Sequence, residues 1–177
     1  MPNKRTSDPA TVARELLERL GMHTAPVPVD KVARALGAQL RFSPLDEELS
    51  GMIYIKDDVP IIGVNALHHP NRQRFTIAHE IGHLAMHRDQ LSNTVHVDKQ
   101  LVILMRNQVS STGQEQMEVE ANRFAAELLM PTDVFEKVLL DTPVDIDDEK
   151  PLLELSRKFK VSKQAIEFRI RNLSPLR

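Results

Sequence analysis

The segment 74–84, Arg-Phe-Thr-Ile-Ala-His-Glu-Ile-Gly-His-Leu, restricts what this chain can fold into and what chemistry it can carry. It contains the pattern His79-Glu80-x-x-His83 within a stretch that is predicted to be helical. Histidines four residues apart lie one turn apart on one helix face, so both rings can reach one ion at about 2.0–2.1 Å. Glu80 lies about 100° further round the helix and can approach a water molecule on that ion. This arrangement is typical of zinc hydrolases.

A catalytic zinc site needs a third protein ligand, and a second predicted helix, residues 114–130, offers several glutamates. Glu118 shares its helix face with small and apolar residues, namely Ala121, Asn122, Ala125, Leu128 and Leu129. Glu120 shares a face with Arg123 and Glu127, which is predicted to be a solvated polar stripe. A carboxylate on an apolar face is costly to bury unless it is paired or binds a metal. Glu118 is therefore the predicted third ligand, with Glu120 as the alternative.

The remaining polar residues near these motifs are given supporting roles. Asn122, four residues after Glu118, is predicted either to orient a ligand by a hydrogen bond or to make an ordinary helix hydrogen bond. His87 lies one turn beyond His83, too far along a straight helix for all three imidazoles to share one ion, and is interpreted as a rim residue. Tyr54, His87 and Arg72 are unranked candidates for stabilising an oxyanion. The other histidines show no ligand spacing and are expected at the surface or as caps: His23, His68, His69 and His96.

Composition narrows the setting of such a site. The chain has no cysteine, so disulfides and thiolate ligands are excluded and any metal must be held by histidine and carboxylate. No apolar run approaches the roughly 20 residues that span a bilayer, and the N-terminus shows no secretory signal. We therefore expect a cytoplasmic protein without a membrane partner. The net charge of −2 shows no overall basic field for nucleic acid.

Capping and periodicity predict an α+β chain. Helices are expected over 9–20, 30–36, 70–87, 114–130 and 133–140, with Asp8 and Asp30 as caps and Gly21 and Gly37 as stops. Alternating or β-branched runs at 38–42, 52–55 and 61–64 predict a small three-stranded sheet. Residues 101–105 fit either a strand or a buried helical turn.

The C-terminal part is predicted to be separate. Residues 132–149 hold seven acidic residues and one basic residue, whereas 150–177 hold eight basic and two acidic residues. We predict a domain over 1–140 with its core motifs at 50–131, an acidic linker at 141–149 and a basic helix-turn-helix-like appendage at 150–177. The appendage could contact DNA, but packing on the main domain and holding a protein partner is favoured.

Gln73–His83 and Glu118–Pro131 together resemble the ImmA/IrrE family of metallopeptidases, over roughly residues 45–140. The resemblance implies a mostly helical, gluzincin-like fold and one Zn²⁺ per chain on ligands matching His79, His83 and Glu118, with Glu80 as the catalytic glutamate. The family's glutamate-x-x-x-asparagine spacing favours Glu118 over Glu120. The resemblance to this family also implies a cytoplasmic bacterial or mobile-element protein that cleaves a helix-turn-helix repressor encoded beside it. Such cleavage would relieve repression of stress, phage or mobile-element genes.

Two classes of function follow. The first is a zinc endopeptidase that acts on a regulatory protein. The alternative is a DNA- or repressor-binding regulator, such as a toxin–antitoxin component, whose metal site is structural or vestigial. Structural zinc normally has four protein ligands, so three predicted ligands and a glutamate placed as a base favour the enzyme. The sequence does not name the substrate, the cleaved bond or the activating signal.

Overall fold

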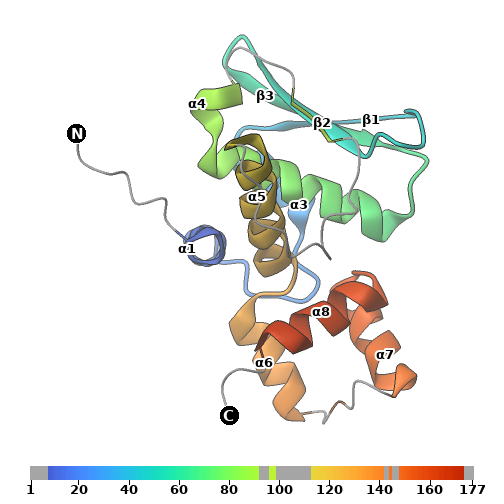
Figure 1. Cartoon of the computed structure of the whole chain (residues 1–177). Coiled ribbons are helices and arrows are strands. Elements are labelled where there is room, and N and C mark those ends of the chain that lie inside the picture. Colours follow the sequence, from blue (N-terminus) through green and yellow to red (C-terminus); the bar gives the residue numbers. More distant parts are fainter. Residues whose placement is uncertain (1–7, 92–95, 99–112, 142–143, 145–147, 174–177) are drawn as a thin grey trace.

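The computed structural model describes residues 8–91, 96–98, 113–141, 144 and 148–173. The predicted strand or helical turn at 101–105 and most of the predicted acidic linker lie outside the described residues. Figure 1 shows a small sheet above two crossing helices, with a separate group of helices below them. The structure confirms the predicted α+β class with predominant helix.

The sheet has four strands in the order β1-β3-β2-β4, where the sequence predicted three. β2 (Gly51–Lys56) and β3 (Val59–Asn65) form the predicted hairpin, β1 (Gln39–Ser43) pairs parallel to β3, and β4 (His96–Asp98) pairs antiparallel to β2. Asp57 and Asp58 both have positive φ, 50° and 63°, as a two-residue hairpin turn of the primed type requires. β4 was missed because three residues carry no readable periodicity.

Two long helices form the centre of the molecule. α3 (Pro70–Met86) begins at Pro70, with the His69 side chain accepting a hydrogen bond from the Asn71 backbone N–H. Every residue of its central stretch, 75–84, is buried. α5 (Gly113–Leu129) packs across it. A Cβ at Gly82 would lie 3.2 Å from Ala121 Cα, so small residues on both helices permit their close approach.

The N-terminal helices follow the predicted limits with one exception. α1 (Pro9–Leu20) is capped by the Asp8 carboxylate and ends at Gly21, whose φ is +63°. α2 (Val29–Ala35) begins one residue before the predicted cap, so the prediction that Asp30 caps it is wrong. Pro28 holds the cap position without a side-chain hydrogen bond, and Val29, the first helical residue, has its side chain buried in the core.

The C-terminal helices form the predicted helix-turn-helix-like unit. α7 (Glu149–Phe159) ends at Lys160, which has a left-handed φ of 52°, and α8 (Lys163–Leu173) is capped by Ser162, whose hydroxyl accepts from the Ala165 backbone N–H at 3.1 Å. The residues predicted to fill the angle are all buried: Leu152, Leu155, Phe159, Val161, Ile166 and Ile170. α6 (Thr132–Asp141) joins the unit to α5, and the Phe135 and Phe159 rings lie 5.0 Å apart.

Several hydrogen bonds fasten this unit to the rest of the described chain. Asn71 donates to the Val161 carbonyl at 3.0 Å and Arg74 to the Lys160 carbonyl at 3.3 Å. The apolar side chains of both parts belong to one continuous core. The division into a domain at 1–140 and an appendage at 150–177 remains a prediction.

Two local predictions were wrong. Where the sequence indicated a break after residue 88, a one-turn helix, α4 (Arg88–Leu91), follows α3. Glu127, assigned to a solvated stripe, is 1% exposed and pairs with Arg169 of α8. The periodicity of α5 cannot show that a helix more than 30 residues later covers this face. No helix among the described residues has the length and apolar character needed to cross a bilayer.

Candidate metal centre

α3 and α5 bring the predicted ligands together. His79 and His83 are 1% and 0% exposed, and their Nε2 atoms lie 3.0 Å apart. From α5, Glu118 places Oε2 3.2 Å from His79 Nε2 and Oε1 3.3 Å from His83 Nε2. The helical repeat aligns the two histidines, and the close crossing at Gly82 brings Glu118 within reach.

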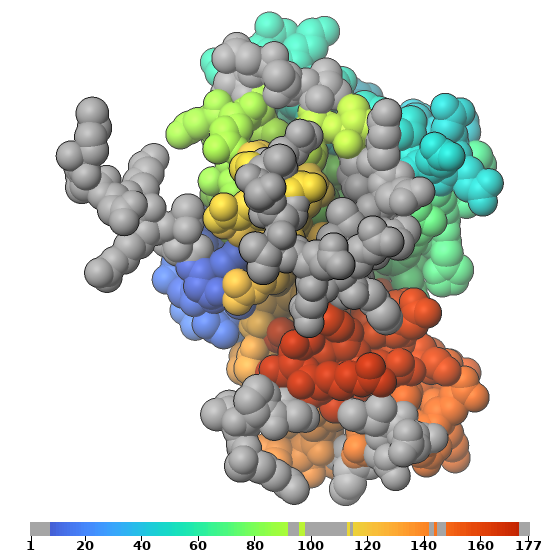
Figure 2. All heavy atoms as spheres, in the orientation of Figure 1, coloured from blue at the N-terminus to red at the C-terminus, as the bar shows by residue number. Residues whose placement is uncertain are grey.

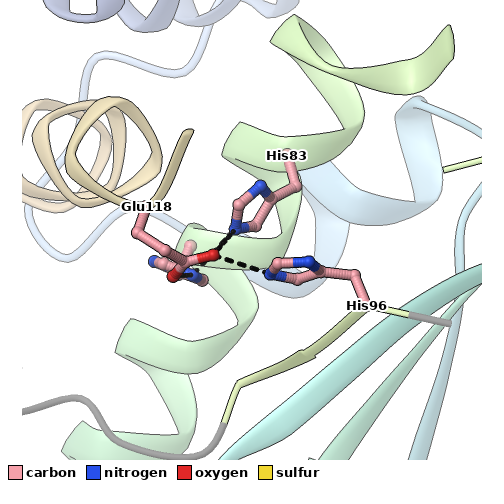
Figure 3. Close-up of side chains that lie close together, drawn as sticks. His83, His96 and Glu118 are labelled. Atoms are coloured by element: carbon pink, nitrogen blue, oxygen red, sulfur yellow. Dashed lines mark hydrogen bonds and ion pairs between the residues drawn. The ribbon is translucent and has the colours of Figure 1, made fainter. Parts of the chain in front are cut away.

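A fourth side chain, His96, completes the cluster. Its Nε2 lies 2.7 Å from Glu118 Oε1, and Figure 3 shows His83 and His96 converging on Glu118. β4 delivers it, since His96 lies opposite the fully buried Ile53 of β2 and directly opposed residues share a face of the sheet. Sequence reasoning expected His96 at the surface or as a cap. Its distance from His83 has no helical spacing, and the Val95-His96-Val97 alternation is too short to predict a strand.

The donor set fits a metal ion. One nitrogen or oxygen from each of His79, His83, His96 and Glu118 lies within 4.8 Å of the others. Ligand atoms of a tetrahedral zinc at 2.0–2.1 Å are separated by about 3.4 Å, close to the separations of 3.0, 3.2 and 3.3 Å among His79, His83 and Glu118. Imidazole and carboxylate are ligands that zinc accepts. We conclude that these residues can hold a metal of this kind.

Asn122 lies next to His79, as expected for a residue that orients a metal ligand by a hydrogen bond. Its Oδ1 lies 3.0 Å from His79 Nδ1. Because an amide oxygen can only accept, the His79 Nδ1 carries the hydrogen and its Nε2 lone pair faces the cluster. Such a contact fixes both the tautomer and the orientation of a ligand ring.

Glu80 is fully buried on the sheet side of α3. A Cβ at Gly51, the first residue of β2, would lie 2.3 Å from Thr76 Cγ2 and 3.4 Å from Glu80 Oε1. Glycine at this position therefore lets β2 approach the carboxylate closely. The pKa of His96 is raised mainly by its hydrogen bond with Glu118, and the charge of Glu80 adds to this effect.

The comparisons with known proteins agree with this arrangement. A sequence model of the IrrE N-terminal-like domain, which is a peptidase family, matches residues 33–171. The chain belongs to this family. The resemblance predicted from the two motifs is thereby confirmed. No curated protein sequence gives a significant match.

A solved structure with a similar fold is a Mycobacterium tuberculosis transcriptional regulator, with a TM-score of 0.65 and 20% sequence identity. The match covers 97% of this chain and 49% of that one, so the IrrE-like chain spans about half the length of this structural relative. At this identity the likeness shows the fold alone.

Electrostatics in this IrrE-like centre suit metal binding. Burial lowers the pKa of His83 to about 4, against the opposing effect of Glu118, so the ring is neutral near pH 7. Burial alone would raise the pKa of Glu118, but contacts with His79, His83 and His96 outweigh it and hold that pKa well below its usual range. The contact with Glu118 raises the pKa of His96, so this ring, unlike that of His83, has to release a proton before it can bind a metal. A neutral imidazole and a charged carboxylate are the forms that bind zinc.

The candidates for oxyanion stabilisation lie outside the cluster. His87 is buried with its Nε2 3.4 Å from Glu120 Oε2, and burial lowers its pKa. Glu120, the alternative third ligand, thus faces His87. Arg72 donates to the Ser50 hydroxyl at 3.0 Å. Tyr54 follows the inward-facing Ile53 in β2, so strand alternation places it on the other face of the sheet.

Proposed function

We propose that this chain is a zinc-dependent endopeptidase that cleaves a partner helix-turn-helix transcriptional repressor. The observation that carries the proposal is the convergence of His79 and His83 from α3 on Glu118 from α5, with the buried Glu80 between the histidines in sequence. Membership of a peptidase family supports the same reaction.

Each residue of the centre has a separate role in the proposed hydrolysis. His79, His83 and Glu118 would hold one Zn²⁺, and Asn122 keeps His79 in the ligating tautomer. Zinc bound there supplies Lewis acidity, which acidifies water and polarises a scissile carbonyl. Glu80 accepts the proton of the attacking water and donates it to the leaving amine. Glu80 is fully buried and directly follows the proposed ligand His79 in α3, which supports this role.

The repressor substrate is proposed from the family resemblance. Relief of stress, phage or mobile-element genes in the cytoplasm would follow from its cleavage. Within this proposal, residues 1–140 form the peptidase part and 150–177 form an appendage that holds the repressor rather than DNA. Two basic residues of α8 support this, because Arg169 pairs with Glu127 and Lys163 with Glu149 inside the chain.

The test is co-incubation of the chain with the repressor encoded beside its gene, with and without the repressor's DNA. Cleavage is expected with the zinc-loaded protein and with Glu136→Gln, a control on the exposed face of α6. Glu80→Gln should bind zinc normally and cleave at least 100-fold more slowly, within the range for loss of a general base. Full cleavage by Glu80→Gln would refute the general-base role. Failure to bind about one zinc per chain would refute the metal site.

A second candidate function is a repressor- or DNA-binding regulator whose zinc is structural. One observation favours it: His96 offers a fourth protein ligand, and structural zinc sites are normally filled by four. A salt-dependent gel shift by the chain alone, without cleavage of any partner, would favour this alternative.

A further inference from the structure

The position of His96 bears on how the proposed metal site is kept inactive, and the inference rests on that proposed function. We propose that His96 is a fourth metal ligand that closes the centre, and that β4 must leave the edge of β2 before a peptide can enter. The resting protein is then latent, and displacement of one short strand opens the metal.

The Nε2 of His96 faces the same carboxylate as the Nε2 atoms of His79 and His83. This nitrogen lies 2.7 Å from Glu118 Oε1, an oxygen that also lies 3.3 Å from His83 Nε2. The rings of His83 and His96 have centroids 4.2 Å apart, and the His96 side chain is 11% exposed. Catalytic zinc sites keep one position for water or substrate, whereas four protein ligands leave none. With His96 in place, the cluster has the composition of a closed site.

The three residues of β4, His96–Asp98, also cover the edge of the sheet. β4 pairs with Gly51–Ile53, the part of β2 next to Thr76 and Glu80. An extended peptide that adds to a sheet needs such an edge to be unpaired, and β4 occupies it beside the proposed base. One strand therefore blocks both the metal and the edge.

The closure is weak enough to be reversible. β4 spans only three residues, so its release breaks a few backbone hydrogen bonds, each of which contributes little net stability, and one metal–ligand bond. Its middle residue, Val97, is 38% exposed and not part of the core. A bound partner can offset this cost, whereas α3 and α5 are held by the buried core.

The first test measures coordination without any substrate, using Co²⁺ as a spectroscopic probe and azide as an added ligand. We expect His96→Ala to bind Co²⁺ at least tenfold more weakly than the unmodified protein. It should also bind azide at least tenfold more tightly, seen as a change in the visible absorption of Co²⁺. His23→Ala is the matched control, since His23 is 46% exposed and pairs with Asp133. It should behave like the unmodified protein.

The results separate the two proposals. Equal Co²⁺ affinity and equal azide titrations for the unmodified protein and His96→Ala would overturn the closure. If His79→Ala still abolished Co²⁺ binding, the three-ligand site would survive that result. Absence of Co²⁺ and Zn²⁺ binding by the unmodified protein would overturn both proposals.

The second test addresses movement of β4. Met52 and Val97 are directly paired across β2 and β4, on the face opposite that of Ile53 and His96, and the chain has no cysteine of its own. The double variant Met52→Cys/Val97→Cys can therefore lock the strand by a single disulfide. Acetohydroxamate should bind the oxidised Co²⁺ form at least tenfold more weakly than the form reduced with TCEP. Equal affinities in the oxidised and reduced forms would refute the requirement that β4 moves.

Discussion

α5 carries two buried glutamates that differ in what surrounds them. Glu118 faces three imidazoles near the sheet, whereas Glu127, nine residues later, faces the guanidinium of Arg169 and receives the Thr132 N–H and hydroxyl at 2.9 Å. The charge of Glu127 is thus balanced by a permanent cation within the chain. Imidazoles are cations only when protonated, so the charge of Glu118 is balanced by protons or by a metal ion.

The contact between Glu127 and Arg169 is therefore structural, whereas the contacts of Glu118 belong to the proposed reactive site. Around Glu127, Arg169 also donates to the Met130 carbonyl at 2.7 Å, so the ion pair joins α5, α6 and α8. Around Glu118, His79 and His83 come from α3 and His96 from β4, and one ligand atom of each of these four residues lies within 4.8 Å of the others. Figure 2 shows the α8 region, in red, below the α5 region, and Arg169 of α8 is the residue that pairs with the buried Glu127. An exchangeable ligand such as a metal ion can therefore bind at the Glu118 cluster and not at Glu127.

The largest expected effect is on metal binding. Glu118→Gln should weaken Zn²⁺ binding by more than a factor of about 100, because losing a ligand costs more than losing an outer contact. Glu127→Gln should leave Zn²⁺ affinity within about threefold of the unmodified protein, since Glu127 has no contact with the cluster. Competition with a chromophoric chelator measures both. Equal losses in the two variants would mean that the glutamates act as one network.

The second effect is on stability, for which we expect Glu127 to matter more than Glu118. Removing one partner of a buried ion pair typically costs about 3–5 kcal/mol, so Glu127→Gln should lower the free energy of unfolding of the metal-free protein by about that amount. Glu118→Gln should cost less, because the partners of Glu118 are imidazoles, of which His83 is neutral near pH 7, and not a permanent cation. Urea unfolding followed by circular dichroism tests this. A smaller loss for Glu127→Gln than for Glu118→Gln would contradict the assignment of Glu127 as structural.

Much of this arrangement could be predicted because it is local. Asp8 and Gly21 mark the ends of α1, and the Glu118 face of α5 is apolar, so short-range rules predicted the helices and their buried faces. The same spacing led to His79, His83 and Glu118, which the structure does bring together, although their roles stay predictions. The family match to residues 33–171 is consistent with both motifs.

What could not be predicted depends on contacts between distant segments. His96 reaches the cluster only because β4 pairs with β2, more than 40 residues earlier, and no spacing rule applies across that interval. Glu127 is buried only because α8 brings Arg169 from 42 residues later in the chain. In both cases the periodicity of one element determines the face of a residue but not what covers that face.

The third effect tests the orientation of a ligand. Asn122→Ala removes the acceptor for His79 Nδ1–H, and loss of such an outer contact typically costs 10–100-fold in metal affinity. Asn122→Asp keeps an acceptor and should restore most of the affinity. Isothermal titration with Zn²⁺ measures both variants. If Asn122→Ala binds Zn²⁺ as tightly as the unmodified protein, the hydrogen bond does not orient the ligand.

A fourth effect is the pH dependence of the metal-free protein. Burial lowers the pKa of His83 to about 4 in the folded state, whereas an unfolded histidine titrates near 6.5. Between these values the unfolded state binds the extra proton, so stability falls as the pH drops from 6.5 to 4. The pKa of His96 is raised by Glu118, so its contribution is complete below pH 6.5 and lost as the pH rises above it.

These two contributions predict a stability maximum near pH 6.5, with a loss on the order of 3 kcal/mol towards pH 4, because the pKa of His83 falls from 6.5 to about 4 on folding and each pKa unit corresponds to about 1.4 kcal/mol. The raised pKa of His96 means that His96 adds no loss over this acidic range. Urea midpoints in EDTA between pH 4 and 8 measure the profile. His83→Gln should flatten the acidic side relative to the unmodified protein, because it removes the neutral buried ring that must be charged on unfolding. An unchanged acidic slope in His83→Gln would show that another group controls the pH dependence of stability. The contrast between Glu118 and Glu127 would then not depend on the protonation of His83.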